Sequence, residues 1–148
     1  MGMKVLFLCH GNINRSAAAE IITKNLFPSV EVRSAGLKDN AGGQITNKRM
    51  REALNSAGYN TEGIRSRKAS QEDVEWADLV FYMDNSNEKK FIDQFGEEPA
   101  RKARKLGMYI GVEKIPDPQF SGPETFKQVV TLIEASIKKF AEIYGLQK

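Results

Sequence analysis

The only cysteine and the only histidine of the chain are neighbours, Cys9 and His10, in the stretch FLCHGNINRSAAAE at residues 7 to 20. An apolar run ends at Cys9 and an alanine-rich helical pattern begins a few residues later. Free backbone N–H groups and the partial positive charge at a helix N-terminus stabilise anions, including a thiolate. Cys9 is therefore a candidate nucleophile near neutral pH. The ordinary alternative for an isolated cysteine is a small buried hydrophobe.

The residues after Cys9 suit an anion-binding turn. The planar guanidinium of Arg15 can hold two oxygens of a phosphate at once. Gly11 permits backbone conformations that other residues resist, and Asn12 tolerates the left-handed one. The Ser16 hydroxyl can donate to a thiolate, and Ser16 is also predicted to cap the following helix. Four such residues in place after a cysteine coincide by chance roughly once in 10⁵ trials, so the spacing predicts a phosphate-binding loop.

The elements that must position this loop follow from hydrophobic patterning. Residues 4–9 form a continuous apolar run, typical of a strand buried on both faces. Further strands are predicted at 30–36, at 78–84 and within 103–111. Helices are predicted from Ser16 to Pro28, from Thr46 to Gly58, after a Ser70–Asp73 start signal, and over 86–96. The clearest helix carries an apolar stripe of Phe126, Val129, Val130, Ile133, Ile137, Phe140, Ala141 and Tyr144.

Because strands alternate with helices, we expect an α/β fold. The predicted architecture is a single three-layer domain over residues 1–148, with a short, about four-stranded parallel sheet and helices on both faces. In such sheets ligands bind beyond the carboxyl ends of the strands. Cys9 is predicted to lie at such an end.

Composition and charge limit the classes of molecule that the chain is expected to bind and the compartment in which it is expected to work. The net charge of +3 and the pI of about 9.0 favour an acidic or phosphorylated partner but are too weak to predict nucleic acid binding. The basic group at 101–105 is expected to be a solvated face. One cysteine permits no internal disulfide, and the apolar run before Cys9 is too short for a signal peptide or a membrane span. We therefore expect a cytoplasmic protein that does not insert into a membrane. The chain suggests no metal site and no cofactor.

The segment CHGNINRS resembles the phosphate-binding loop of the low-molecular-weight protein tyrosine phosphatases, C-x-G-N-x-C-R-S. The segments RSAG (33–36), MDNSN (83–87) and PDPQF (116–120) fall in the same order as in that family, so the resemblance covers nearly the whole chain. It implies that Cys9 attacks phosphorus and that Arg15 and the loop amides hold the phosphate. It also implies that Asp117 protonates the leaving group and then acts as the base that hydrolyses a phosphocysteine. Taken alone, Asp117 between two prolines reads as an ordinary turn aspartate.

The resemblance also implies a wider set of site residues. The expected substrate-binding residues are His10, Gly11, Asn12, Ile13, Asn14, Ser16, Asn40 and Phe120. His10 occupies a variable position of the motif, and we expect its imidazole to take no direct part in catalysis. The loop is expected to be braced by Asn12, Ser16 and Ser34. The family's bracing histidine is replaced by Ile64, so a less rigid brace is expected.

Asn14 stands where the family has a second loop cysteine. Many relatives use that thiol to form a reversible disulfide under peroxide, and this chain cannot. We therefore expect peroxide to drive Cys9 to higher oxidation states that thiols recover poorly. Arsenate reductases with the same loop pass the oxidation through two further cysteines, so that activity is not expected here.

The substrate walls differ from the family pattern as well. Asn40 replaces an aromatic residue, and Gln119 and Phe120 stand where two aromatics are common. Ile13 occupies the position at which phosphoarginine phosphatases carry Thr, which favours phosphotyrosine. The expected partner is a phosphotyrosine-containing protein, with a tyrosine kinase as one candidate. The alternatives are a phosphatase for phosphoarginine or small aryl phosphates, and a phosphate-binding module without turnover.

Overall fold

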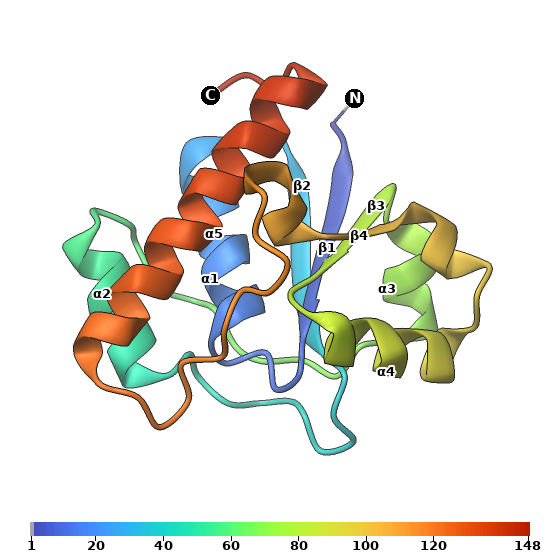
Figure 1. Ribbon diagram of the computed structural model, residues 1–148, viewed down its shortest axis with the longest axis horizontal. Coiled ribbons are helices and arrows are strands. Elements are labelled where there is room, and N and C mark those ends of the chain that lie inside the picture. The colour runs from blue at the N-terminus through green and yellow to red at the C-terminus, as the bar shows by residue number, and fades with distance from the viewer. Residues whose placement is uncertain (1) are drawn as a thin grey trace.

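The computed structural model describes residues 2–148, and its centre is a four-stranded sheet in the order β2-β1-β3-β4 (Figure 1). All three strand pairings are parallel. The strands are β1 (Lys4–Cys9), β2 (Glu31–Gly36), β3 (Leu79–Tyr82) and β4 (Ala103–Lys105). The predicted parallel sheet of about four strands is confirmed.

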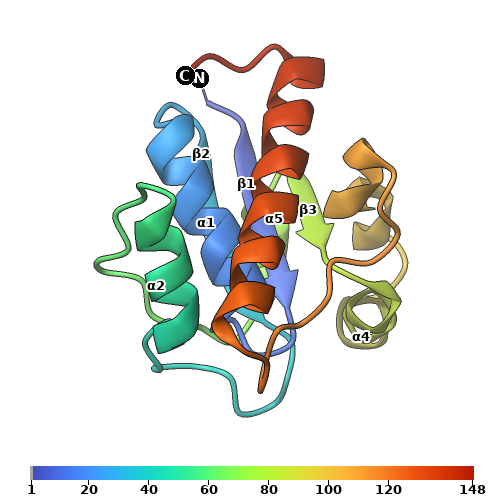
Figure 2. The same cartoon turned by 60° about the vertical axis from the view of Figure 1, so that its left-hand side comes forward.

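Helices cover both faces of this sheet (Figures 1 and 2). One face carries α1 (Arg15–Leu26), α2 (Lys48–Ser56) and α5 (Pro123–Tyr144). The other face carries α3 (Gln71–Trp76) and α4 (Asn85–Phe95). Two short 3-10 helices, η1 (Pro99–Lys102) and η2 (Leu106–Ile110), flank β4. The three-layer α/β architecture predicted from the sequence is therefore confirmed.

The central strand β1 contributes to two separate apolar cores. Val5, Phe7 and Cys9 face the core shared with α1, α2 and α5. Leu6 and Leu8 face the core shared with α3 and α4. Alternate side chains of a strand point to opposite faces, so a strand between two helical layers must be apolar throughout. This burial on both faces holds the carboxyl end of β1, and with it Cys9, in a fixed place.

Two predicted strands are longer than the observed ones. The segment predicted at 78–84 forms a strand only over Leu79–Tyr82, because Asp84 instead caps α4 by accepting a hydrogen bond from the Asn87 backbone N–H at 2.9 Å. The segment 103–111 forms a strand only over Ala103–Lys105 and then turns into η2. β4 lies at the edge of the sheet, where β3 is its one neighbour among the described strands. Only three residues of β3 pair with it, so no further hydrogen bonds between these strands lengthen β4.

Other local predictions are confirmed. Ser70 and Asp73 form a reciprocal capping box at the start of α3. The stripe on α5 packs into the core as predicted, except that Tyr144 at its end is 41% exposed.

Candidate active site

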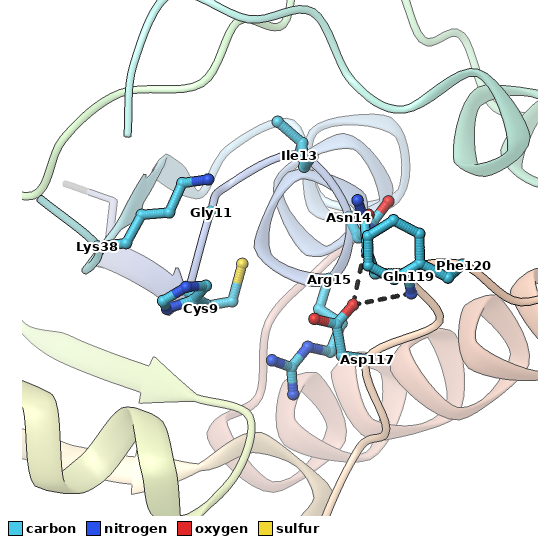
Figure 3. Close-up of a pocket in the computed structure, with 10 residues that line it drawn as sticks. Cys9, Gly11, Ile13, Asn14, Arg15, Lys38, Asp117, Gln119 and Phe120 are labelled. Atoms are coloured by element: carbon cyan, nitrogen blue, oxygen red, sulfur yellow. Dashed lines mark hydrogen bonds between the residues drawn. The ribbon is translucent and has the colours of Figure 1, made fainter. Parts of the chain in front are cut away.

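Cys9 lies at the floor of a cavity of about 440 Å³ at the carboxyl end of the sheet (Figure 3). Its Sγ lies 2.9 Å from Ser16 Oγ, and its side chain is buried. The loop between β1 and α1 supplies most of the lining: Cys9, His10, Gly11, Ile13, Asn14 and Arg15. Distant segments add Lys38, Asp117, Gln119 and Phe120. The cavity therefore brings together the three residues for which the sequence predicted chemistry, Cys9, Arg15 and Asp117.

Asn12 is the residue that shapes the loop. Its φ of 59° is left-handed, which a short amide side chain tolerates. Its buried amide nitrogen donates to Ser16 Oγ at 2.8 Å and to Ser34 Oγ at 2.9 Å. Its amide oxygen accepts from the Arg67 backbone N–H at 2.9 Å. Gly11, in contrast, does not have a positive φ, so the unusual conformation in this turn is carried by Asn12.

Ser16 does not cap the helix, contrary to the prediction. α1 begins at Arg15, and its N-cap is Asn14, which makes no side-chain capping bond. Ser16 is the second residue of α1, and its hydroxyl contacts Cys9 Sγ and the Asn12 amide instead. A hydroxyl at this position can donate to a thiolate because the amide of Asn12 already donates to it.

The brace of the loop ends on a residue that the sequence analysis missed. Ser34 Oγ donates to Glu20 Oε1 at 2.5 Å, and Glu20 Oε2 pairs with Lys24 Nζ at 2.6 Å. Glu20 is almost fully buried on α1. Ile64, at the position of the family's histidine, is half-buried and packs against the core. Glu20 is the only acidic residue of α1 and directly follows three alanines, and this was the signal available in the sequence.

The end of β2 approaches the loop so closely that only glycine fits there. A Cβ on Gly36 would lie 3.0 Å from both the Gly11 carbonyl carbon and the His10 oxygen. Beyond Gly36, Leu37 and Lys38 continue the pairing by donating to the Cys9 and His10 carbonyls, each at 2.9 Å. This contact explains the RSAG segment in physical terms.

The same contact places Lys38, and not Asn40, at the cavity. A Cβ on Gly11 would lie 3.9 Å from Lys38 Nζ, so the ammonium reaches over the loop. Asn40 is exposed and does not line the cavity. Phe120 stands at the mouth, 96% exposed and with a left-handed φ of 69°.

Arg15 is held by groups from two other segments. Its Nη1 donates to Asp84 Oδ2 and to the Ile115 carbonyl, each at 2.8 Å, and the side chain is 3% exposed. Among residues 2–148, Nε and Nη2 have no hydrogen-bond partner and are available to an anion. Burial raises the pKa of the Asp84 carboxyl, but hydrogen bonds from Arg15 and the Asn87 backbone outweigh it, and the pKa lies below its usual range. Asp84 belongs to the MDNSN segment, for which the sequence indicated no role.

Asp117 lies between η2 and α5 and faces the cavity (Figure 3). Its Oδ1 accepts from the Gln119 backbone N–H at 3.1 Å and lies 3.5 Å from the Asn14 amide nitrogen. The loop is attached to the end of β3 through Ile115, whose N–H donates to the Met83 carbonyl at 3.0 Å.

His10 also lines the cavity, and its titration reflects the local charge. Partial burial of the imidazole lowers its pKa below 6.5, and the charges of Lys90 and Lys38 lower it further, while Asp117 opposes them. No cluster of three or more His, Cys, Asp or Glu side chains with metal-binding geometry occurs among residues 2–148. In the same range, no helix has the length and apolar character needed to cross a membrane.

A sequence profile described as low molecular weight phosphotyrosine protein phosphatase matches residues 4–148. The chain belongs to this family. It is accordingly a phosphoric monoester hydrolase, and the family resemblance inferred from the CHGNINRS loop is confirmed.

Individual relatives agree over nearly the whole chain. The Synechocystis protein slr0328, named for the same family, is 34% identical over 145 residues, covering 89% of this chain and 90% of its own. The structure of Vibrio vulnificus Wzb in complex with benzylphosphonate superposes with a TM-score of 0.90 at 25% identity, covering 97% and 99% of the two chains. The structure of the YwlE arginine phosphatase from Geobacillus stearothermophilus superposes with a TM-score of 0.86 at 27% identity. The match covers 97% of this chain and 93% of that one.

Proposed function

We propose that this phosphatase hydrolyses phosphotyrosine in proteins through a phosphocysteine intermediate. The observation that carries the proposal is the convergence of Cys9, Arg15 and Asp117 on one cavity. A thiolate of Cys9 attacks phosphorus as the bond to the tyrosine oxygen breaks, and Asp117 gives its proton to that oxygen. Water then attacks phosphorus, Asp117 accepts a proton from it, and the thiolate leaves. Arg15 and the backbone amides of the loop hold the non-bridging oxygens throughout.

The cavity wall supports an aryl substrate. Ile13 and the exposed ring of Phe120 provide apolar surface at the mouth, against which a phenyl ring can pack. The Vibrio vulnificus relative is described in complex with benzylphosphonate, in which a methylene group joins the phosphonate to a phenyl ring. A phosphotyrosine-containing protein is the proposed partner, with a tyrosine kinase as one candidate, and the cytoplasm is the proposed location.

Hydrolysis of para-nitrophenyl phosphate near pH 6, with a chelator present, tests the mechanism. We expect activity in the wild type, none in Cys9→Ser, and a loss of about 10²- to 10⁴-fold in Asp117→Ala. Loss of activity on adding the chelator would refute the cysteine mechanism. Phosphate binding without turnover in the wild type would instead identify a binding module.

Phosphoarginine is the second candidate substrate, because the Geobacillus relative of similar fold is an arginine phosphatase. Matched peptides carrying phosphotyrosine or phosphoarginine separate the two. We expect kcat/KM to favour phosphotyrosine, and Ile13→Thr to shift that ratio toward phosphoarginine by roughly 10-fold, the effect of one altered wall contact. A wild-type preference for phosphoarginine would overturn the assignment.

A further inference from the structure

Asn14 has a polar side chain that performs none of the tasks expected at its position. It is the N-cap residue of α1 but makes no capping bond, and it is only 4% exposed. Its amide nitrogen instead reaches across the cavity to the loop of Asp117. It donates to Gln119 Oε1 at 2.8 Å and lies 3.5 Å from Asp117 Oδ1 (Figure 3).

The orientation of the Asn14 amide leaves one of its polar atoms unpaired within the described part of the chain, which by itself lowers the stability of the fold. Asn14 Oδ1 is buried and has no hydrogen-bond partner among residues 2–148. A buried unpaired acceptor is destabilising. The reverse orientation would set the amide oxygen against two acceptors, Gln119 Oε1 and Asp117 Oδ1, and repel both. The amide nitrogen is therefore held toward the loop by the oxygens on it.

Neighbouring residues of the phosphate loop hold both sides of Asp117. Arg15 Nη1 donates to the carbonyl of Ile115, two residues before Asp117, at 2.8 Å. Asn14 contacts Gln119, two residues after it, and the Gln119 backbone N–H donates to Asp117 Oδ1 at 3.1 Å. The side of Ile115 is also attached to the sheet through the Met83 carbonyl. On the other side, Asn14 is the residue that contacts Gln119 itself, and Arg49 donates to the Ser121 carbonyl two residues further on.

We propose that Asn14 and Gln119 are positioning residues that keep the Asp117 carboxyl aimed at the leaving-group oxygen. The inference rests on the proposed role of Asp117 as general acid. It assigns a function to the residue that replaces the family's second cysteine. Proton transfer requires the acid within hydrogen-bond reach of the oxygen, so loosening the loop on one side slows this step while phosphate binding is retained.

The test is the dependence of kcat/KM on the leaving group, measured with aryl phosphates from para-nitrophenyl to phenyl phosphate. Phenoxide is a poorer leaving group than para-nitrophenoxide. Hydrolysis of phenyl phosphate therefore depends more strongly on the proton from Asp117 than hydrolysis of para-nitrophenyl phosphate does. We expect Asn14→Ala and Gln119→Ala to lose roughly 10-fold or more on phenyl phosphate and less than about 3-fold on para-nitrophenyl phosphate. Inhibition by inorganic phosphate should change by less than about 2-fold in both. Gln128→Ala, an exposed glutamine on α5, is the matched control.

A double-mutant cycle separates this inference from the proposed mechanism. In an Asp117→Ala background, Asn14→Ala should cost nothing further on phenyl phosphate, because it acts only through that carboxyl. Equal losses on all leaving groups, or multiplied losses in the double variant, would overturn the inference while leaving Asp117 as the acid. Undiminished activity of Asp117→Ala would overturn the mechanism itself. If Asn14→Ala does not fold, Gln119→Ala on the loop carries the same test.

Discussion

The side chains around Cys9 form two chains of hydrogen bonds that hold the residues lining the cavity. One runs from Ser16 through Asn12 and Ser34 to Glu20, and it fixes the shape of the loop. The other runs from Arg15 to Asp84, and it fixes the guanidinium. The first chain is buried, the second is partly exposed at Asp84, and both reach a carboxylate. A buried network that is satisfied to its end holds its members more rigidly than one that leaves polar atoms unpaired.

Ser34 lies in the middle of the hydrogen-bond chain from Asn12 to Glu20, and its removal should weaken the loop. Ser34→Ala leaves the amide of Asn12 and the carboxylate of Glu20 each without one partner, and we expect kcat to fall about 10-fold. Glu20→Gln keeps an acceptor in place and should cost less. Steady-state kinetics on para-nitrophenyl phosphate measures both, with Ser56→Ala at the exposed end of α2 as the control. Undiminished turnover of Ser34→Ala would exclude Ser34 from the brace.

His10 is the only histidine, so one imidazole signal reports on the cavity. Partial burial, Lys90 and Lys38 lower its pKa below 6.5 in the free protein. A bound phosphate adds negative charge nearby, which favours the imidazolium, so saturating inorganic phosphate should raise the pKa. NMR titration with and without phosphate measures this shift. An unchanged midpoint would contradict an anion bound beside His10.

The same residue affects stability. The folded pKa of His10 is the lower one, so between it and 6.5 the unfolded chain binds more protons. The free energy of unfolding should therefore rise with pH across this window. His10→Gln should remove that part of the slope in urea denaturation, and an unaltered slope would count against the lowered pKa.

At the scale of elements, α3 supports the loop from behind. Its buried Asp73 accepts from Arg67 Nη2 at 2.6 Å and from the Ser70 backbone at 3.1 Å. The backbone N–H of Arg67 in turn donates to Asn12. Burial raises the pKa of the Asp73 carboxyl, but the hydrogen bonds from Arg67 and Ser70 outweigh it and hold the pKa below its usual range. The capping box is therefore connected through Arg67 to Asn12 in the turn after Cys9.

This support predicts a loss of stability in Asp73→Asn. The side chain keeps its size but loses a buried charge that is paired with two arginines, Arg67 and Arg33. We expect a cost of about 2 kcal/mol in the free energy of unfolding. Because the folded pKa is the lower one, this contribution is present above the unfolded value near 4 and is lost as the pH falls through the folded value. Urea denaturation at pH 7 and pH 3 should show the gap between the variant and the wild type narrowing in acid.

The exposed carboxylate of Asp93 provides the control for this prediction. It is paired with Lys89 on α4 at 3.4 Å, and its side chain is 63% exposed. Asp93→Asn should change the free energy of unfolding by less than about 1 kcal/mol. A similar loss in both variants would mean that burial of Asp73 adds nothing.

At the scale of the whole molecule, the parallel sheet gathers the site. The turn after β1, the end of β2 and the segment after β3 all leave the sheet at its carboxyl edge, and the loop before α5 joins them there (Figure 1). No segment holds the complete set of groups. Three of these parts line the cavity, namely the turn after β1, the segment after β2 and the loop before α5, while the segment after β3 acts through the contact of Asp84 with Arg15. Binding of a ligand in the cavity should therefore stabilise the fold as a unit.

The presence of a single cysteine in the whole chain also limits how Cys9 can recover from oxidation. With a single cysteine, a sulfenic acid at Cys9 has no second thiol in the molecule with which to form a disulfide. After sustained peroxide we expect dithiothreitol to restore only a minor part of the phosphatase activity. The Asn14→Cys variant restores the family's second thiol and should recover more. Full recovery of the wild type would contradict the expectation.

The sequence alone determined the α/β order, the strand that delivers Cys9 and the loop to Arg15, because each depends on residues close together in the chain. It identified Asp117 only by resemblance. The tertiary structure decided that Glu20 ends the brace, that Lys38 replaces Asn40 at the cavity, and that Asn14 contacts Gln119. These contacts join segments 14 to 105 residues apart or depend on how one strand end approaches another. Local periodicity carries information over about one helical turn, so only the folded backbone could reveal them.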